Sequence, residues 1–68
     1  MDIKYLNKML ICKVKTGPIR VGERVYCFGY DESTNCYWIN VSHRLIFGVN
    51  QLKIGAGLIK NFRLAMGE

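Results

Sequence analysis

The fold is decided by residues 21–49, which read VGERVYCFGYDESTNCYWINVSHRLIFGV. Three short apolar-rich runs lie in this stretch, at residues 25–30, 36–41 and 45–49, and only a few turn-forming residues separate them. Short strand-like runs divided by such residues are typical of an antiparallel β-meander. The stretch therefore predicts three consecutive strands of a small all-β protein.

Alternation along these runs predicts which side chains face the core, because successive residues of a strand point to opposite faces. In the second and third runs the expected inward-facing residues are Tyr37, Ile39, Phe47 and Val49. Trp38 then lies on the opposite face. The first run is apolar on both faces, and Gly29 within it would permit a bend or a bulge.

The segments on either side of the meander complete the expected sheet. Residues 9–16 alternate as a half-buried first strand that includes Leu10, Cys12 and Val14 on its core side. Gly17-Pro18 then breaks the strand, and Gly22 is expected to make the turn into the meander.

At the two ends of the chain the pattern is weaker. Residues 1–8 suit an N-terminal arm or a short helix. Residues 50–53 are expected to form one 3₁₀ turn, and residues 62–66 a fifth strand that closes the sheet. The apolar spacing within residues 58–66 also fits a helix, so the sequence leaves both assignments open.

Length and composition bound the class of protein. With 68 residues, half of them hydrophobic and 22% charged, the chain is expected to be one globular domain. The uncharged run at residues 45–52 is far shorter than the roughly 20 residues of a membrane helix. The N-terminus also lacks the apolar core of a signal peptide. We therefore expect a cytoplasmic protein that makes no contact with a membrane.

The three cysteines, Cys12, Cys27 and Cys36, each fall inside an expected strand. An odd number of cysteines without an export signal predicts reduced, buried thiols, and a Cys27–Cys36 disulfide across a hairpin is the alternative. The cysteines are too far apart in sequence for the paired ligands of a zinc site. We therefore expect no metal and no cofactor.

Side chains suited to catalysis are few. His43 is the one histidine and falls in an expected turn, whereas the thiols fall inside strands. Nucleophilic catalysis needs a nucleophile, a base and an orienting group together in one pocket. Asp31 and Glu32 are neighbours, so their carboxylates point apart and do not form an acid–base pair. We therefore expect that the chain is not an enzyme.

The order of these elements can be compared with known folds. The residues concerned are Val21-Gly22-Glu23, the polar turn at residues 31–35, Tyr37-Trp38-Ile39, and Phe47-Gly48-Val49 before Leu52. Over residues 9–66 this layout resembles a Src-homology-3-like barrel, and in particular the small stand-alone barrels of bacteriophage and bacterial proteins. The resemblance implies a five-stranded barrel with a 3₁₀ turn before its last strand.

Peptide-binding members of that family carry an acidic loop beside an aromatic groove for proline-rich ligands. In this chain the corresponding loop has a single acid, Glu23, beside Arg20 and Arg24. We therefore do not expect it to recognise proline-rich peptides.

The first functional hypothesis is a non-catalytic interaction module, such as a phage-type regulator or inhibitor that binds a host or viral protein. An exposed tryptophan can anchor such an interface. The expected contact residues are Trp38, Tyr26, Tyr30, Ile59 and Phe62. Because large apolar patches are seldom left exposed, the C-terminal segment also predicts a homodimer or a hetero-complex.

The alternative hypothesis is a small nucleic-acid-binding barrel. Ten Lys and Arg residues stand against five Asp and Glu residues, which gives a formal net charge of +5. A small basic domain attracts nucleic acid. The expected phosphate contacts are Lys13, Lys15, Arg20, Arg24 and Arg44, and Trp38 would stack on a base. The sequence leaves the choice between the two hypotheses open.

Overall fold

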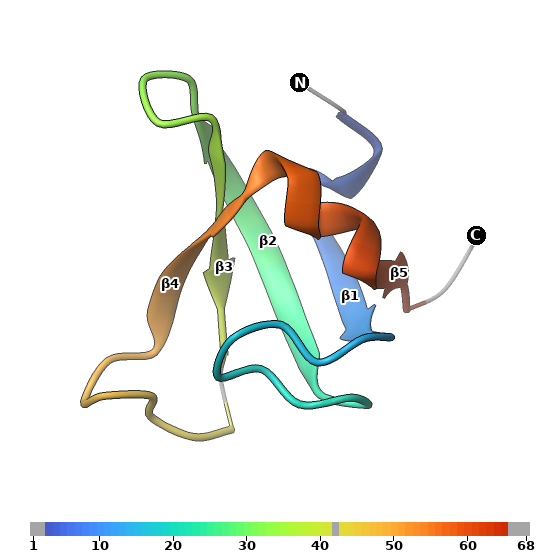
Figure 1. Cartoon of the computed structure of the whole chain (residues 1–68), viewed down its shortest axis with the longest axis vertical. Helices are drawn as coiled ribbons and strands as arrows, with labels where there is room; N and C mark the ends of the chain where they lie inside the picture. The colour runs from blue at the N-terminus through green and yellow to red at the C-terminus, as the bar shows by residue number, and fades with distance from the viewer. Residues whose placement is uncertain (1–2, 42, 66–68) are drawn as a thin grey trace.

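The computed structural model describes residues 3–41 and 43–65 as five antiparallel strands and two short 3₁₀ helices (Figure 1). The strands are β1 (Lys8–Cys12), β2 (Arg24–Asp31), β3 (Cys36–Asn40), β4 (Gln51–Gly55) and β5 (Phe62–Leu64). The helices are η1 (Ile3–Tyr5), before β1, and η2 (Ala56–Asn61), between β4 and β5. The expected all-β class is confirmed. Neither of these described helices is long and apolar enough to span a membrane.

The strands form one open sheet in the order β4-β3-β2-β1-β5. η2 carries the chain from the β4 edge of the sheet to β5, which pairs with β1 (Figure 1). β4 and β5 are the two edges, so the last strand extends the sheet instead of closing it. The fifth strand expected from the sequence is confirmed over Phe62–Leu64, and Met66 lies outside the described residues.

The core lies against one face of the sheet. Alternate strand residues are buried there, and they include Leu10, Cys12, Val25, Cys27, Tyr37, Ile39, Ile54 and Phe62. Ile59 of η2 and the loop residues Ile19 and Ile46 complete the same cluster. The expected N-terminal segment forms the single turn η1, whose Tyr5 packs edge-on against Tyr37 with ring centroids 6.3 Å apart.

A bulge in β2 changes which aromatic side chains face the core. The register between β2 and β3 shifts between Cys27 and Gly29, as the glycine predicts. Because of the extra residue, Tyr30 joins the core face, where its ring centroid lies 5.1 Å from that of Tyr37. Simple alternation would have put Tyr30 on the outer face, on which Phe28 remains.

β1 is shorter than the sequence predicts, since the strand ends at Cys12 and does not continue to residue 16. The amides of Lys13 and Val14 both donate to the carbonyl of Asn61, at 2.7 and 3.2 Å, which draws the chain away from β2. Val14 is therefore exposed, and its expected place in the core is wrong. Gly22 makes the expected turn into β2, with φ +91°.

The fourth strand lies later in the chain than expected. Residues 45–49 alternate like a strand but form a loop, in which Leu45, Phe47 and Val49 are exposed. The strand that pairs with β3 is Gln51–Gly55, with Gln51 opposite Asn40. The 3₁₀ turn expected at residues 50–53 is wrong for the same reason, because those residues are needed for β4.

Candidate functional site

Two long connections, one between β1 and β2 and one between β3 and β4, lie at the same end of the sheet (Figure 1). Each contains a small hairpin in which two residues exchange backbone hydrogen bonds, Thr16 with Ile19 and Ile46 with Val49. We call residues 16–19 the Gly17 tip and residues 46–49 the Phe47 tip. Ile19 and Ile46 are both buried, so each tip is anchored to the core.

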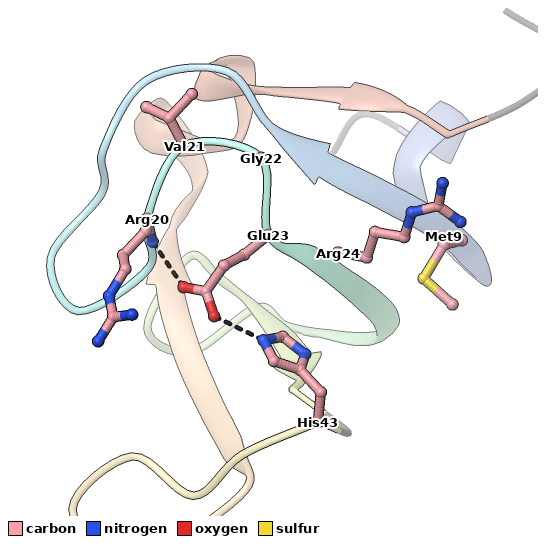
Figure 2. A pocket seen from close by; sticks show the side chains of 7 residues that line it. All are labelled: Met9, Arg20, Val21, Gly22, Glu23, Arg24 and His43. Carbon is pink, nitrogen blue, oxygen red and sulfur yellow. Dashed lines mark hydrogen bonds and ion pairs between the residues drawn. The ribbon is translucent and has the colours of Figure 1, made fainter.

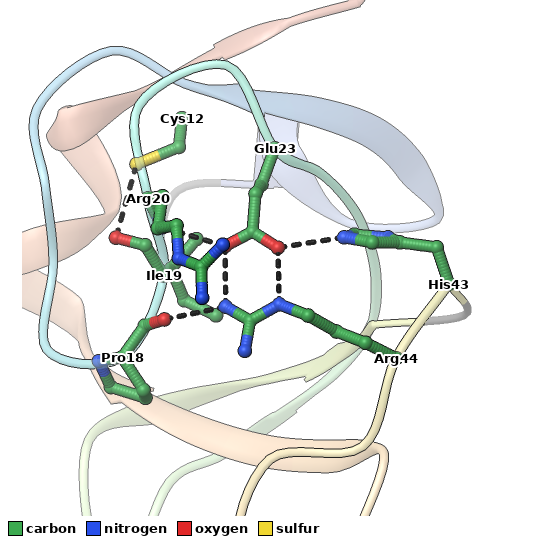
Figure 3. Close-up of polar contacts among 7 residues, drawn as sticks. All are labelled: Cys12, Pro18, Ile19, Arg20, Glu23, His43 and Arg44. Carbon is green, nitrogen blue, oxygen red and sulfur yellow. Dashed lines mark hydrogen bonds and ion pairs between the residues drawn. The ribbon is translucent and has the colours of Figure 1, made fainter.

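A bidentate ion pair ties the two connections together (Figure 3). Nε of Arg44 donates to Oε2 of Glu23, and a terminal nitrogen of Arg44 donates to Oε1, both at 2.6 Å. The same terminal nitrogen donates to the carbonyl of Pro18 at 2.7 Å. Arg44 therefore holds the first connection at two points.

Both carboxylate oxygens of Glu23 have hydrogen-bond partners within the protein. Its Oε2 also lies 2.6 Å from Nε2 of His43, and its Oε1 accepts from the amide of Arg20 at 2.6 Å. The Arg44 guanidinium holds the pKa of the Glu23 carboxyl well below its usual range. Glu23 is thus ionised at neutral pH, and its charge is offset locally.

A hollow of about 640 Å³ opens beside this cluster (Figure 2). It is lined by Met9, Arg20, Val21, Gly22, Glu23, Arg24 and His43. Arg20 and Arg24 are exposed, whereas the one carboxylate in the lining is already paired. The hollow therefore suits an anionic ligand better than a cationic one.

The cysteines are free thiols. Sγ of Cys12 lies 3.0 Å from the carbonyl oxygen of Val14, and burial raises the pKa of the Cys12 thiol. Burial likewise raises the pKa of Cys27. Cys36 is only half-buried, which corrects the expectation of three buried thiols. Within residues 3–41 and 43–65 no group of His, Cys, Asp and Glu could hold a metal ion.

The Phe47 tip carries the most exposed of the large apolar side chains that the structure describes. Phe47 is 90% exposed, and Leu45 and Val49 beside it are exposed as well. Phe47 has φ +54° and Gly48 has φ +81°, the pair of positive values found in a type I′ turn. A bulky side chain is rare in the left-handed region and destabilises the fold there by about 1–2 kcal/mol.

The outer face of the sheet carries a second apolar surface, the aromatic patch of Tyr26, Phe28 and Trp38. The Phe28 and Trp38 rings are stacked, with centroids 6.1 Å apart and an interplanar angle of 29°. Nζ of Lys53 lies 5.1 Å from the Trp38 ring and 2.8 Å from a carboxylate oxygen of Asp31. This lysine lowers the pKa of Asp31.

The structure separates the expected protein-contact residues. Ile59 and Phe62 are buried in the core, so their expected role as an exposed contact is wrong. Their burial follows from the tertiary fold, in which η2 and β5 cover the core beside β1. Tyr30 is half-buried on the core face, and only Tyr26 and Trp38 remain on the outer face.

The expected phosphate contacts are divided too. Arg44 is committed to the ion pair with Glu23, so it does not project as a phosphate ligand. Lys15 donates to the carbonyl of Gly17, at 2.9 Å. The three that remain exposed without such a contact are Lys13, Arg20 and Arg24.

Sequence reasoning missed Phe47 as a surface residue. The alternation of residues 45–49 resembles that of a buried strand, and Phe-Gly is not among the dipeptides that signal a type I′ turn. The one available signal is Gly48, since a glycine inside a strand-like run often marks a turn or bulge.

Comparison with known proteins assigns the chain to no family. No protein-family model matches it, and neither a curated protein nor a solved structure does. The fold defines a small all-β protein with one antiparallel sheet.

Proposed function

We propose that this protein is a non-catalytic interaction module that binds a protein partner through the Phe47 tip. The observation that carries the proposal is the 90% exposure of Phe47 at a backbone position with φ +54°. Its side chain adds almost nothing to the core, and its conformation opposes folding. Such a side chain gains favourable contacts only from another molecule.

The tip is built to present that ring without losing much entropy on binding. Ile46 anchors it in the core, and Arg44 at its base is fixed by Glu23. Preorganised aromatic side chains are typical binding hot spots, because little freedom remains to be lost when they enter a pocket. Leu45 and Val49 widen the apolar contact on either side of the ring.

The surroundings indicate the chemistry of the partner. The basic hollow that contains Arg20 and Arg24 also includes His43, close to the base of the Phe47 tip. Complementary charge favours association and selects among partners. A suitable partner therefore offers an apolar pocket with an acidic rim, which a regulator or inhibitor of phage type would occupy.

The architecture supports the proposed relation to Src-homology-3-like barrels. A long loop with a glycine turn precedes the three meander strands β2, β3 and β4, and η2 stands before the last strand. In this proposal binding takes place at the end of the sheet where the two long connections lie.

The test is capture of a partner by immobilised protein from a lysate of its native cells. Phe47→Asn creates the Asn-Gly pair that type I′ turns prefer, so the fold is retained while the ring is removed. We expect this variant to capture at least about tenfold less of a partner protein than the wild type captures. Leu58→Asn is the matched control, because Leu58 is exposed on η2 away from the tip, and it should retain the partner.

Light scattering across a dilution series shows whether the partner is a second copy. A dimer that Phe47→Asn dissociates would make the tip a self-contact, whereas a monomer that captures another protein makes it a hetero-contact. The proposal fails if the Phe47→Asn variant captures every protein that the wild type captures and also has the same oligomeric state by light scattering.

A further inference from the structure

The β4 edge of the sheet is open along its whole length. All five residues of β4 pair with β3 without a bulge, and no strand of the described residues lies on its other side (Figure 1). The opposite edge, β5, has only three residues. Edge strands present unpaired backbone groups to other chains unless they are short, bent or guarded by charge. β4 is therefore the edge that suits pairing with another chain.

The hydrogen-bond pattern shows which backbone groups of β4 face the open side. The carbonyl of Asn50 accepts from the amide of Val41 at 2.8 Å, and the amide of Ala56 donates to a carbonyl at the start of β3 at 2.9 Å. In an antiparallel pair only every second residue directs its N–H and C=O to the partner strand. Positions 50, 52, 54 and 56 therefore face β3, and the backbone groups of Gln51 and Lys53 point to the open side. Within residues 3–41 and 43–65 no other segment hydrogen-bonds to them.

The one charged residue of β4 does not guard this edge. A lysine on an edge strand commonly prevents further strand pairing. Here Nζ of Lys53 lies 2.8 Å from a carboxylate oxygen of Asp31 and 5.1 Å from the centre of the Trp38 ring. The charge of Lys53 is thus paired and held over β3 and the end of β2, so it leaves the edge open.

The side chains of β4 indicate what an added segment would carry. Ile54 is buried, and the half-buried Leu52 packs against the core cluster. Alternate residues of an added strand lie beside these two side chains on the same face of the sheet. Apolar residues at alternate positions of the segment would therefore continue the core and cover the part of Leu52 that water reaches.

Charge favours a segment of another protein over a second copy of this chain. Each copy has a formal net charge of +5, and pairing of two β4 strands would bring both Lys53 residues to one seam, where like charges repel. The Phe47 tip ends at Val49, two residues before Gln51. A protein held at the tip therefore lies next to the β4 edge.

We propose that the open edge of β4 binds an extended segment of the partner protein as an additional strand. Its backbone pairs with Gln51 and Lys53, and its apolar side chains lie beside Leu52 and Ile54. Strand addition takes affinity from main-chain hydrogen bonds and specificity from alternate side chains. The inference rests on the proposed function for the choice of a protein partner, and it names the part of that partner that binds beside the Phe47 tip.

The probe is a library of random peptides of about ten residues, displayed on phage and selected on the immobilised protein. We expect the selected peptides to share β-branched or aromatic residues at alternate positions and to lack proline between them. A selected peptide, made by synthesis, is then the ligand for two measurements.

Amide hydrogen exchange locates the peptide on the sheet. In the free protein the amides of Leu52 and Ile54 face β3 and should exchange slowly, whereas those of Gln51 and Lys53 should exchange fast. Saturating peptide should slow exchange at Gln51 and Lys53 by at least about tenfold. Leu52 and Ile54 are the internal reference.

Two variants of one residue separate the backbone from the side chain. Lys53→Pro removes the outward N–H, and proline is tolerated on an edge strand where the N–H faces solvent. Lys53→Ala is the matched control, since it removes the same contacts with Asp31 and Trp38 but keeps the N–H. We expect Lys53→Pro to weaken peptide binding at least about tenfold, and Lys53→Ala less than about threefold.

The inference is overturned if no peptide is selected, if the two Lys53 variants bind the peptide equally, or if Gln51 and Lys53 are not protected. A dimer of the free protein that Lys53→Pro dissociates also overturns it, because the edge would then pair with a second copy. Hydrogen exchange needs no variant, so it decides the question even where Lys53→Pro does not fold. Phe47→Asn should bind the peptide like the wild type, so failure of strand addition is distinguishable from failure of the proposed contact at the tip.

Discussion

In both the Gly17 tip and the Phe47 tip, two residues exchange backbone hydrogen bonds and the first residue of the turn has φ +54°. In one tip that residue is glycine, which adopts the conformation without a steric penalty. In the other it is a phenylalanine, which does not. The same positive φ is therefore adopted without strain at Gly17 and with strain at Phe47, whereas the second residues of the two turns differ, since Gly48 has φ +81° and the ring of Pro18 holds its φ negative. The side chain at the strained position is one that the fold does not need.

The two tips also differ in what their residues do. The Gly17 tip is a support, because the carbonyl of Pro18 accepts a hydrogen bond from Arg44 of the other connection. The Phe47 tip extends into solvent beyond these contacts of Arg44 and exposes an aromatic ring. One tip thus steadies the loop end of the sheet, and the other is free to make contact there.

The largest effect is expected from removing the Glu23–Arg44 ion pair, which joins the two connections that carry the tips. Glu23→Gln should lower the free energy of unfolding by about 2–3 kcal/mol at pH 7, because Arg44 loses its charged, largely buried partner. Urea denaturation measures this difference. Glu32→Gln, an exposed carboxylate in the turn between β2 and β3, is the control and should change stability little.

The effect of Glu23→Gln should depend on pH. The pKa of Glu23 is lowered in the folded protein from an ordinary value of 4.5, so ionised Glu23 stabilises the fold fully above that pH. The stabilisation is lost as pH falls below 4.5 toward the folded pKa. The difference between wild type and variant should therefore be constant near neutrality and shrink in acid. A difference that persists unchanged at pH about 3 would contradict the assignment.

A smaller effect is expected from putting a side chain into the Gly17 tip. Gly17→Ala should destabilise the protein by about 1 kcal/mol, because φ is positive there while no atom lies within 4 Å of the added methyl group. Gly57→Ala is the control, since Gly57 also has open space but no positive φ. Equal results for the two alanines in thermal denaturation would rule out backbone strain as the cause.

The smallest effect has the opposite sign and concerns the Phe47 tip. Phe47→Asn should stabilise the protein by about 0.5–1 kcal/mol, a rise of a few degrees in Tm, because asparagine tolerates positive φ. Leu45→Asn, at an exposed position without positive φ, should change Tm little. A loss of stability in Phe47→Asn would mean that the ring supports the fold, and the comparison between the tips would fail.

The sequence by itself determined the features that depend on neighbouring residues. The strands β2 and β3, the polar turn between them, the turn at Gly22 and the bulge near Gly29 all follow from local alternation and from glycine or side-chain turn chemistry. The all-β class follows from these elements, because they fill the centre of a short chain.

Only the tertiary structure decided where the remaining segments lie. An alternating run such as residues 45–49 reads alike whether it pairs in a sheet or lines a loop, since burial depends on the partner and not on the pattern. Ile59 and Phe62 are buried because β5 returns to β1, a long-range pairing without a local signal. The same pairing places Arg63 and Arg24 on either side of Ile11, an arrangement that exists only in the folded chain.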